Sequence, residues 1–572
     1  MSPDKKAEKT SKKAPVNVVL CWHMHQPQYQ DQFTRDFALP WTYLHAIKDY
    51  VDMAAVVEEV PQSRVVVNFT PVLLDQLDDY IQQFERYFKL GEPFSDGVLR
   101  ALSAPAIGPT ESLRLVIIRQ CVRANENRLI NRFDAYHELV QLARQTLNKP
   151  HYLNYLDEQF FFDLLVWYHL VWMGETVRMR NETVQRLMRK ARGYTLSDRR
   201  ELLSVIDSLL RTIVPRYRHL ADSGQMELSV TPDKHPILPL LLDFRCALEA
   251  MPNAPLPEHS LYPGGQLRAR EHLVNGIASF ERHFGFKPVG CWPSEGALSQ
   301  ETLQLLQDAG FQWTATGGGV LSNSRNANGL GNVCIHHPFS FDGIPLTCFF
   351  RDDNLSDLIG FTYSGWNETD AVNNLLHHIE NIRNACNYNP ETIVPIILDG
   401  ENCWEYYANN GHTFLKTLYT KLIEHPDICL TTFRDYLKTN PTPTVMKKIV
   451  AGSWVYGTLS TWIGDHAKNR AWDLLCQAKN DFDRVMAQGR LSPEVAERAR
   501  EQLAICEGSD WFWWFGDYNP AESVSDFDRL YRTHLKNLYR FLGEPAPTTL
   551  DHVISRGGGT PENDGVMRRG QG

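Results

Sequence analysis

Seven short runs of consecutive apolar residues recur along the chain, separated by stretches whose hydrophobic positions have helical spacing. The runs lie at 17–23, 64–71, 226–232, 288–293, 311–316, 345–350 and 392–398. They are continuously apolar rather than alternating, which is typical of parallel strands covered by helices on both faces. The pattern therefore predicts an α/β fold built as a parallel barrel.

Two long regions have helical patterns throughout. One is an insertion at about 110–223, between the second and third apolar runs, and the other follows residue 440. We expect a barrel domain over 15–440 and a mainly helical domain over 441–545. The charged residues 1–14 and the glycine-rich residues 546–572 are predicted to be disordered tails.

Polar side chains cluster directly after the apolar runs. The residues in question are His23, His25, His235, Glu295, Asp399 and Glu401. In parallel barrels the carboxyl ends of the strands carry the chemistry, so we expect these side chains to converge there.

Two of these residues are carboxylates held on tight turns at strand ends. Glu295 is followed by Gly296, and Asp399 by Gly400. Glycoside hydrolysis uses such a pair, one group attacking the anomeric carbon and the other transferring protons. Either acid alone is better explained as a helix cap or a satisfied strand-end carboxylate, and only the two together favour catalysis. Their neighbours Trp292 and Trp404 favour a sugar site, and we count both as candidate substrate contacts.

The histidines leave two alternatives open. His23 and His25 face the same side of their strand, which suits hydrogen bonds to sugar hydroxyls or ligation of a metal. A metal needs a third ligand, for which His235 is the best candidate and Asp399 the next. Because no HExxH motif accompanies them, we expect no metal and no other cofactor. A metal-dependent barrel hydrolase remains the competing hypothesis.

Three further charged residues have two explanations each. Glu227 lies early in the third apolar run, so it either binds substrate or is paired in a polar network. Arg351 and Asp352 follow the sixth run and are either substrate contacts or part of a surface salt-bridge cluster.

Six tryptophans near the C-terminus either line a glucan cleft or dock the helical domain: Trp454, Trp462, Trp472, Trp511, Trp513 and Trp514.

Composition narrows the class of protein. The 572 residues carry a formal net charge of −10 and a pI near 6.1, which excludes the basic footprint of a nucleic-acid-binding protein. Eleven cysteines without a CxxC pair indicate reduced thiols rather than a disulfide framework or a zinc cluster. The charged N-terminus has no signal-peptide pattern, and no apolar run reaches eighteen residues. We therefore expect a cytoplasmic protein without membrane contact.

Six segments together resemble glycoside hydrolase family 57, in particular its amylopullulanase-like and α-amylase-like members. They are WHMHQP (22–27), GQMELSVTPDKHPILPLL (224–241), GCWPSEGALS (290–299), LDGENCWEYY (398–407), STWIGDHAKNRAW (460–472) and SDWFWWFGDYN (509–519). Each segment is weak alone, but the set in this order is specific and spans most of residues 17–545.

The resemblance implies an incomplete seven-stranded barrel whose active site is partly closed by the C-terminal helical domain. It implies retaining double displacement on α-1,4 bonds, and as a further candidate α-1,6 bonds, of glycogen, starch or maltodextrins. By motif match Glu295 is the nucleophile and Asp399 the acid/base. Four positions shape the glucan subsites: His23, His25, Glu227 and Trp462. Glu401 is expected to help keep Asp399 protonated.

Three places in the sequence bear on which members of the family the chain resembles. Gly317 and Gly318 stand where similar proteins usually carry an Asp-Glu pair, while HQP at 25–27 and WPSEG at 292–296 differ from the family's branching enzymes. Both catalytic acids remain, so we expect an active enzyme. A 4-α-glucanotransferase and a non-catalytic glucan-binding protein are the remaining alternatives.

Overall fold

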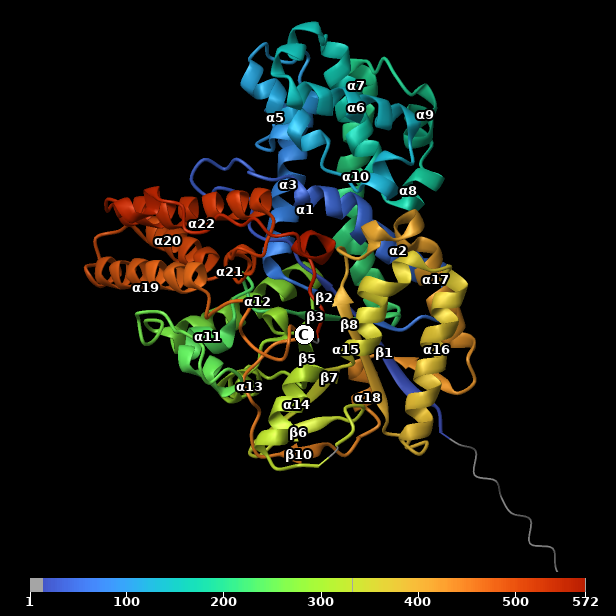
Figure 1. Ribbon diagram of the computed structural model, residues 1–572, viewed down its shortest axis with the longest axis vertical. Helices are drawn as coiled ribbons and strands as arrows, with labels where there is room; N and C mark the ends of the chain where they lie inside the picture. The colour runs from blue at the N-terminus through green and yellow to red at the C-terminus, as the bar shows by residue number, and fades with distance from the viewer. Residues whose placement is uncertain (1–13, 332, 571–572) are drawn as a thin grey trace, which may run out of the picture.

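The computed structural model describes residues 14–331 and 333–570 (Figure 1). All seven predicted strands are present: β1 (Val16–Met24), β2 (Val65–Phe69), β3 (Met226–Val230), β4 (Gly290–Cys291), β5 (Trp313–Gly317), β7 (Ile344–Arg351) and β8 (Ile393–Asp399). They lie side by side in the order β7-β5-β4-β3-β2-β1-β8, and all pair in parallel. The predicted N-terminal tail falls almost wholly outside the described residues.

The sheet curls into a barrel that stays open between β7 and β8. These two strands do not pair as neighbours in a sheet, and only isolated hydrogen bonds connect them. The Arg351 Nε donates to the Ile397 carbonyl at 2.7 Å, and the Asp352 N–H donates to the Pro395 carbonyl at 2.8 Å. Three short strands extend the sheet, namely β6 (Phe339–Phe341), β9 (Ile428–Thr431) and β10 (Thr444–Met446). The fold is thus an incomplete seven-stranded (β/α) barrel, as expected.

Aromatic and aliphatic side chains fill the barrel and close it at the amino-terminal ends of its strands. Phe433 of the short helix α18 (Phe433–Leu437) packs against Trp313 and Phe349, with ring centroids 4.4 and 4.5 Å apart. The outer faces are covered by α12 (Gly265–Phe284), α13 (Gln300–Asp308), α16 (Glu368–Ala385) and α17 (His412–Glu424). Because both faces of the strands are buried, their sequences are mostly apolar, and the few polar side chains among them, such as Asn68 and Glu227, are buried as well.

Both expected helical regions are present. The insertion forms a body at one end of the molecule from α5 (Glu111–Cys121), α6 (Asp134–Asn148), α7 (Glu158–Val171), α8 (Glu175–Arg180), α9 (Glu182–Lys190) and α10 (Leu196–Asp222) (Figure 1). The C-terminal region contains α19 (His466–Ala487), α20 (Pro493–Cys506), α21 (Asp510–Trp514) and α22 (Ala521–Leu542). Within the described residues, no helix is both long and apolar enough to cross a membrane. The division into domains at residue 440 stays a proposal.

The C-terminal segment, residues 546–570, is ordered, so the prediction of a disordered tail there is wrong. It runs back over the mouth of the barrel (Figure 1). The Gly570 N–H donates to Asp357 at 2.9 Å, and the Gly570 carbonyl accepts from the Tyr456 N–H at 3.0 Å. Trp513 donates from its indole to the Gly565 carbonyl at 2.9 Å. Glycines that suggested disorder instead let the backbone pass close to its neighbours.

Candidate active site

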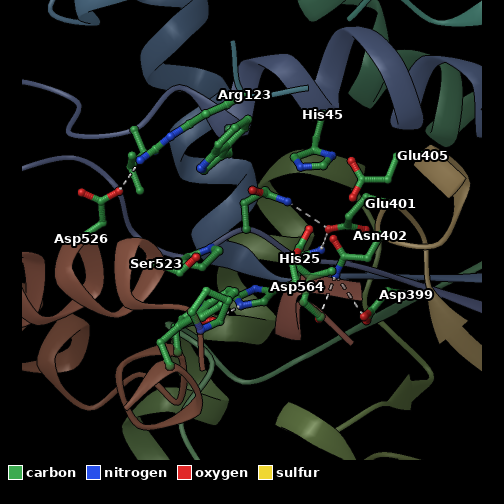
Figure 2. Close-up of a pocket in the computed structure, with 18 of the residues that line it drawn as sticks. His25, His45, Arg123, Asp399, Glu401, Asn402, Glu405, Ser523, Asp526 and Asp564 are labelled. Carbon is green, nitrogen blue, oxygen red and sulfur yellow. Dashed lines mark hydrogen bonds and ion pairs between the residues drawn. The ribbon is translucent and has the colours of Figure 1, made fainter. Parts of the chain in front are cut away.

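A cavity of about 780 Å³ opens at the carboxyl ends of the strands. Five of the residues predicted from sequence line it: His23, His25, Glu295, Asp399 and Glu401. Arg123 of the helical insertion and Asp526 of α22 form its opposite wall, and Asp564 comes from the C-terminal segment (Figure 2). The barrel, both helical regions and the C-terminal segment therefore build one site.

Glu295 is held by a backbone that side-chain-bearing residues rarely adopt. Its φ and ψ are 58° and 21°, in the left-handed region. The next residue, Gly296, has φ 58°, and a Cβ there would lie 2.8 Å from the Trp292 ring. Strained residues persist only where the surroundings fix them, and such positions cluster at functional sites. The turn fixes the Glu295 carboxylate at the cavity wall.

Trp454 holds the Glu295 carboxylate directly. Its indole Nε1 donates to Glu295 Oε2 at 3.0 Å, and its backbone N–H donates to the Glu295 carbonyl at 3.2 Å. Burial, and next the charge of Asp399, raise the pKa of Glu295 well above its usual value, while the Trp454 bond lowers it. The indole thus favours the ionised, nucleophilic form of this acid.

Asp399 ends β8 beside His23 of β1 and faces the same cavity (Figure 2). Burial raises the pKa of Asp399 to about 6, opposed by an Asn402 amide that donates to its Oδ2 at 3.3 Å. A carboxyl group with a pKa near neutrality can both give and take a proton at physiological pH. Asp399 is therefore suited to acid/base catalysis.

Glu401, just after β8, forms a hydrogen bond to the chain that follows β1. Its Oε1 accepts from the His25 N–H and the Tyr50 hydroxyl, each at 3.0 Å, while its Oε2 is buried with no partner among the described residues. Burial, and next the charge of Asp399, raise the pKa of Glu401 well above its usual value. That Glu401 in turn keeps Asp399 protonated stays a prediction.

Three histidines stack beside the carboxylates. The ring of His235 lies 3.8 Å from that of His25 and 5.3 Å from that of His23, measured between centroids. His25 Nε2 lies 2.8 Å from Asp510 Oδ1. His25, His235 and Asp510 bring one ligand atom each within 4.8 Å of one another. A metal under the competing hypothesis would thus use Asp510, which sequence did not indicate, in place of His23.

Glu227 lies inside the barrel and does not line the cavity, so its prediction as a substrate contact is wrong. It is the second residue of β3, well before the carboxyl end of that strand. Its carboxylate accepts from the Trp313 indole at 2.7 Å and from the Arg434 N–H at 2.8 Å. The alternative of a paired polar network is correct.

Arg351 and Asp352 form buried pairs behind the cavity wall instead of facing a sugar. Arg351 donates to Asp353 at 2.8 Å and to Asp357 at 2.9 Å. Asp352 caps the short helix α15 (Asp353–Asp357), accepting from the Leu355 N–H at 2.9 Å. They are the predicted salt-bridge cluster, but in the protein interior rather than on the surface.

The tryptophans divide into an inner and an outer layer. Trp292, Trp404 and Trp462 are fully buried and lie behind the cavity lining, which corrects their assignment as direct contacts. Trp292 packs edge-on against Trp454 at 5.2 Å, and Trp462 lies 6.0 Å from Trp513. The rings that line the cavity are Trp41, Trp172, Trp454, Trp513 and Trp514. His235 is likewise buried, beneath His25.

Sequence reasoning missed the polar lining that comes from outside the strands. Arg123, Asn402, Asp510, Asp526 and Asp564 line the cavity, and only Asn402 lies close to a strand end. The others come from the helical insertion, the C-terminal helices and the C-terminal segment. Asp510 lies within the aromatic segment at 509–519, but that segment was singled out for its tryptophans and its family resemblance rather than for this acid.

Gly317 and Gly318 have a packing role. A Cβ on Gly317 would lie 2.5 Å from the Trp454 Cα, and one on Gly318 would lie 2.9 Å from Asp353 Oδ2. The glycines therefore let the 453–457 loop approach the strand end and bring Trp454 onto Glu295. Without side chains at these two positions, Trp454 can reach the Glu295 carboxylate.

Trp454→Phe is expected to lower kcat/KM roughly 10-fold to 100-fold, because a hydrogen bond to an ionised group is lost. The bond lowers the pKa of Glu295, so its loss raises that pKa, and the acidic limb of the pH–rate profile moves to higher pH. Steady-state kinetics across pH measure both effects. Trp366→Phe, at an exposed tryptophan, is the matched control. An unmoved acidic limb would contradict the role of the indole.

Removal of residues 561–572 is expected to lower kcat/KM roughly 10-fold to 100-fold through misplacement of cavity groups. The segment supplies Asp564 and Val566 to the lining, and Arg568 stacks on Trp513 at 4.4 Å. Kinetics on maltooligosaccharides and thermal melting measure the change. Arg556→Ala, at an exposed position just before the deleted residues, controls for surface effects. Unchanged kinetics in a folded truncated protein would show that the segment does not shape the site.

Comparisons with known proteins agree with this fold. The model of glycosyl hydrolase family 57 matches residues 19–450. The branching enzyme of Thermococcus kodakaraensis shares the fold at 14% identity and a TM-score of 0.58, over 92% of this chain and 90% of that one. The α-amylase AmyC of Thermotoga maritima does so at 14% identity and a TM-score of 0.57, over 92% and 94%.

One curated relative also matches in sequence. It is a 1,4-alpha-glucan branching enzyme of Thermococcus kodakarensis, 29% identical over 108 residues, which are 19% of this chain and 13% of that enzyme. The chain thus aligns with only a small part of that relative's length. Because the family model spans most of the chain, this protein belongs to glycosyl hydrolase family 57.

Proposed function

We propose that the chain cleaves α-1,4-glucosidic bonds of glycogen, starch or maltodextrins with retention of configuration. The observation that carries the proposal is that two carboxylates, the buried Glu295 after β4 and the half-buried Asp399 at the end of β8, line one cavity. Membership in a glycosidase family supports a reaction by paired carboxylates. The cytoplasm remains our proposed location, in keeping with cysteines that are free thiols and mostly buried.

In the first step a Glu295 oxygen attacks the anomeric carbon. The glycosidic bond breaks as the leaving oxygen takes the proton from Asp399, which leaves a glycosyl ester on Glu295 and a carboxylate on Asp399. In the second step Asp399 takes a proton from water, or from a sugar hydroxyl, whose oxygen attacks the same carbon. The ester bond breaks, and both carboxyl groups return to their starting states.

The lining of the cavity fits a glucan chain. Trp513 and Trp514 from α21 and Trp41 from the barrel offer apolar faces to sugar rings, while His25, Arg123 and Glu401 offer hydrogen bonds. Nucleic acid and membranes are not among the expected partners, since the chain carries net negative charge.

Products formed from a single maltooligosaccharide test the reaction and its acceptor. Early release of shorter sugars alone indicates hydrolysis. Longer linear sugars indicate 4-α-glucanotransfer, and new α-1,6 linkages, visible by proton NMR, indicate branching. We expect shorter products with retained anomeric configuration. Binding without any turnover would instead support the non-catalytic hypothesis.

A chelator separates this mechanism from the competing metal-dependent one. The stacked pair His25 and His235, with Asp510, is where such a metal would bind. Prolonged treatment with EDTA is expected to leave the glucan activity unchanged. Activity lost with EDTA and restored by a metal bound without thiolate ligands, at His25, His235 and Asp510, would overturn the proposal that two carboxylates suffice.

A further inference from the structure

A second group of potential ligands lies outside the active-site cavity. Cys334 and His336 come from the loop between α14 (Gly318–Ala327) and β6, and Cys386 caps the C-terminal end of α16. The two sulfurs are 3.3 Å apart, and Cys334 Sγ is 3.6 Å from His336 Nδ1. All three ligand atoms lie within 4.8 Å of one another. Residues 52 positions apart in sequence thus point at one spot.

The imidazole of His336 is oriented from behind. Its Nε2 lies 2.8 Å from Asp352 Oδ2, and Asp352 is itself fixed because its other oxygen accepts from the Leu355 N–H at 2.9 Å. This pair turns Nδ1 toward the thiols. Metal-bound histidines almost always give their second N–H to a carboxylate or carbonyl in this way, which sets the tautomer and the ring orientation.

The site is reachable from solvent and has room for a further ligand. Both thiols are half-buried, while His336 is buried. A shallow surface pocket lies over the three side chains and includes Asn387 and Asn389. Zinc is bound by thiolates and imidazole in tetrahedral sites, and a site with three protein ligands takes water as the fourth.

We propose that Cys334, His336 and Cys386 bind a zinc ion that fastens the open edge of the barrel. The ion would tie the loop at 333–338 to the end of α16. The loop already contacts the seam, since the His336 carbonyl accepts from the Ile393 N–H at the start of β8, at 3.1 Å. Through Asp352 the ion also reaches the end of β7. The ion would thereby link β7 and β8, the two edge strands of the open barrel that do not pair with each other.

A disulfide between Cys334 and Cys386 is the competing explanation. It accounts for the two neighbouring thiols but gives no role to His336, whose free nitrogen is aimed at Cys334 by Asp352. The sequence analysis predicted neither a disulfide nor a zinc site, since these cysteines are far apart along the chain and form no recognised spacing. The geometry favours the metal.

Metal analysis of the full-length protein, purified with reductant and without added chelator, tests the proposal. We expect a single zinc ion per chain by mass spectrometry of the elements. Replacement by cobalt is expected to give a thiolate-to-cobalt charge-transfer band, which a metal at His25, His235 and Asp510 does not produce. Cys334→Ser and Cys386→Ser should abolish the band, while Cys429→Ser, at an exposed cysteine elsewhere, should keep it.

Asp352→Asn provides a milder test, with an expected loss of about 10-fold to 100-fold in zinc affinity. If a cysteine variant does not fold, alkylation of the native protein decides instead, because zinc should protect Cys334 and Cys386 but not Cys429. Two results would overturn the proposal. One is a reduced, folded protein that binds neither zinc nor cobalt with thiolate ligation, and the other is a Cys334–Cys386 disulfide in the purified protein.

Discussion

Glu295→Gln is expected to lower kcat/KM on maltooligosaccharides by at least about 10⁴-fold, since the amide cannot form the glycosyl ester. Binding should persist, because the rest of the cavity is untouched. The melting temperature should not fall, since the raised pKa of Glu295 means that burial opposes its charge and the amide carries none. Steady-state kinetics, calorimetric binding and thermal melting measure the three quantities.

Glu301→Gln is the matched control for this variant. Glu301 lies exposed in the first turn of α13, a few residues beyond the catalytic turn, and has no cavity contact. We expect its kinetics to equal those of the unmodified protein. If Glu295→Gln kept kcat/KM within tenfold of that value, Glu295 would not be the nucleophile.

Asp399→Asn is expected to lower kcat/KM on natural glucans by about 10²-fold to 10⁴-fold, because the leaving oxygen then departs without a proton. The loss should be much smaller on α-glucosyl fluoride, whose leaving group needs little protonation. Azide should restore turnover of the fluoride and form an α-glucosyl azide, since an anionic nucleophile needs no base. Equal losses on both substrates, without rescue, would contradict the acid/base role.

The pH profile provides an independent check on Asp399. Burial raises its pKa to about 6, so the group is protonated below that pH and becomes a carboxylate above it. Since the first step needs the acid form, kcat/KM should fall as the pH rises through about 6. In Asp399→Asn this basic limb should disappear. A basic limb that stayed in place would assign it to another group.

The sequence predicted the barrel well because its strands are buried on both faces. In a run such as 392–398 nearly every position is apolar, so the strand can be recognised without knowing which side chains face which side of the sheet. All seven strands were located in this way. Glu295 and Asp399 were found for a related reason, since a polar residue directly after such a run must lie at the mouth of the barrel. Glu227 failed the same reasoning because it lies at the start of its strand rather than the end.

The remaining part of the site depends on contacts between distant segments. The bond from Trp454 to Glu295 requires the close approach at Gly317, which no local pattern encodes. Residues 546–570 looked disordered because they bury few apolar side chains, yet backbone bonds such as Gly570 to Asp357 hold them. Cys334 and Cys386 are brought together only by the fold.

The covalent intermediate tests the central claim most directly. A fluorinated maltosyl fluoride that glycosylates the enzyme faster than it is released should accumulate as an ester, which peptide mapping by mass spectrometry locates. We predict a single maltosyl adduct on Glu295, absent from Glu295→Gln. An adduct on Asp399 or Glu401, or turnover with inverted anomeric configuration and no adduct, would contradict the two-carboxylate retaining mechanism.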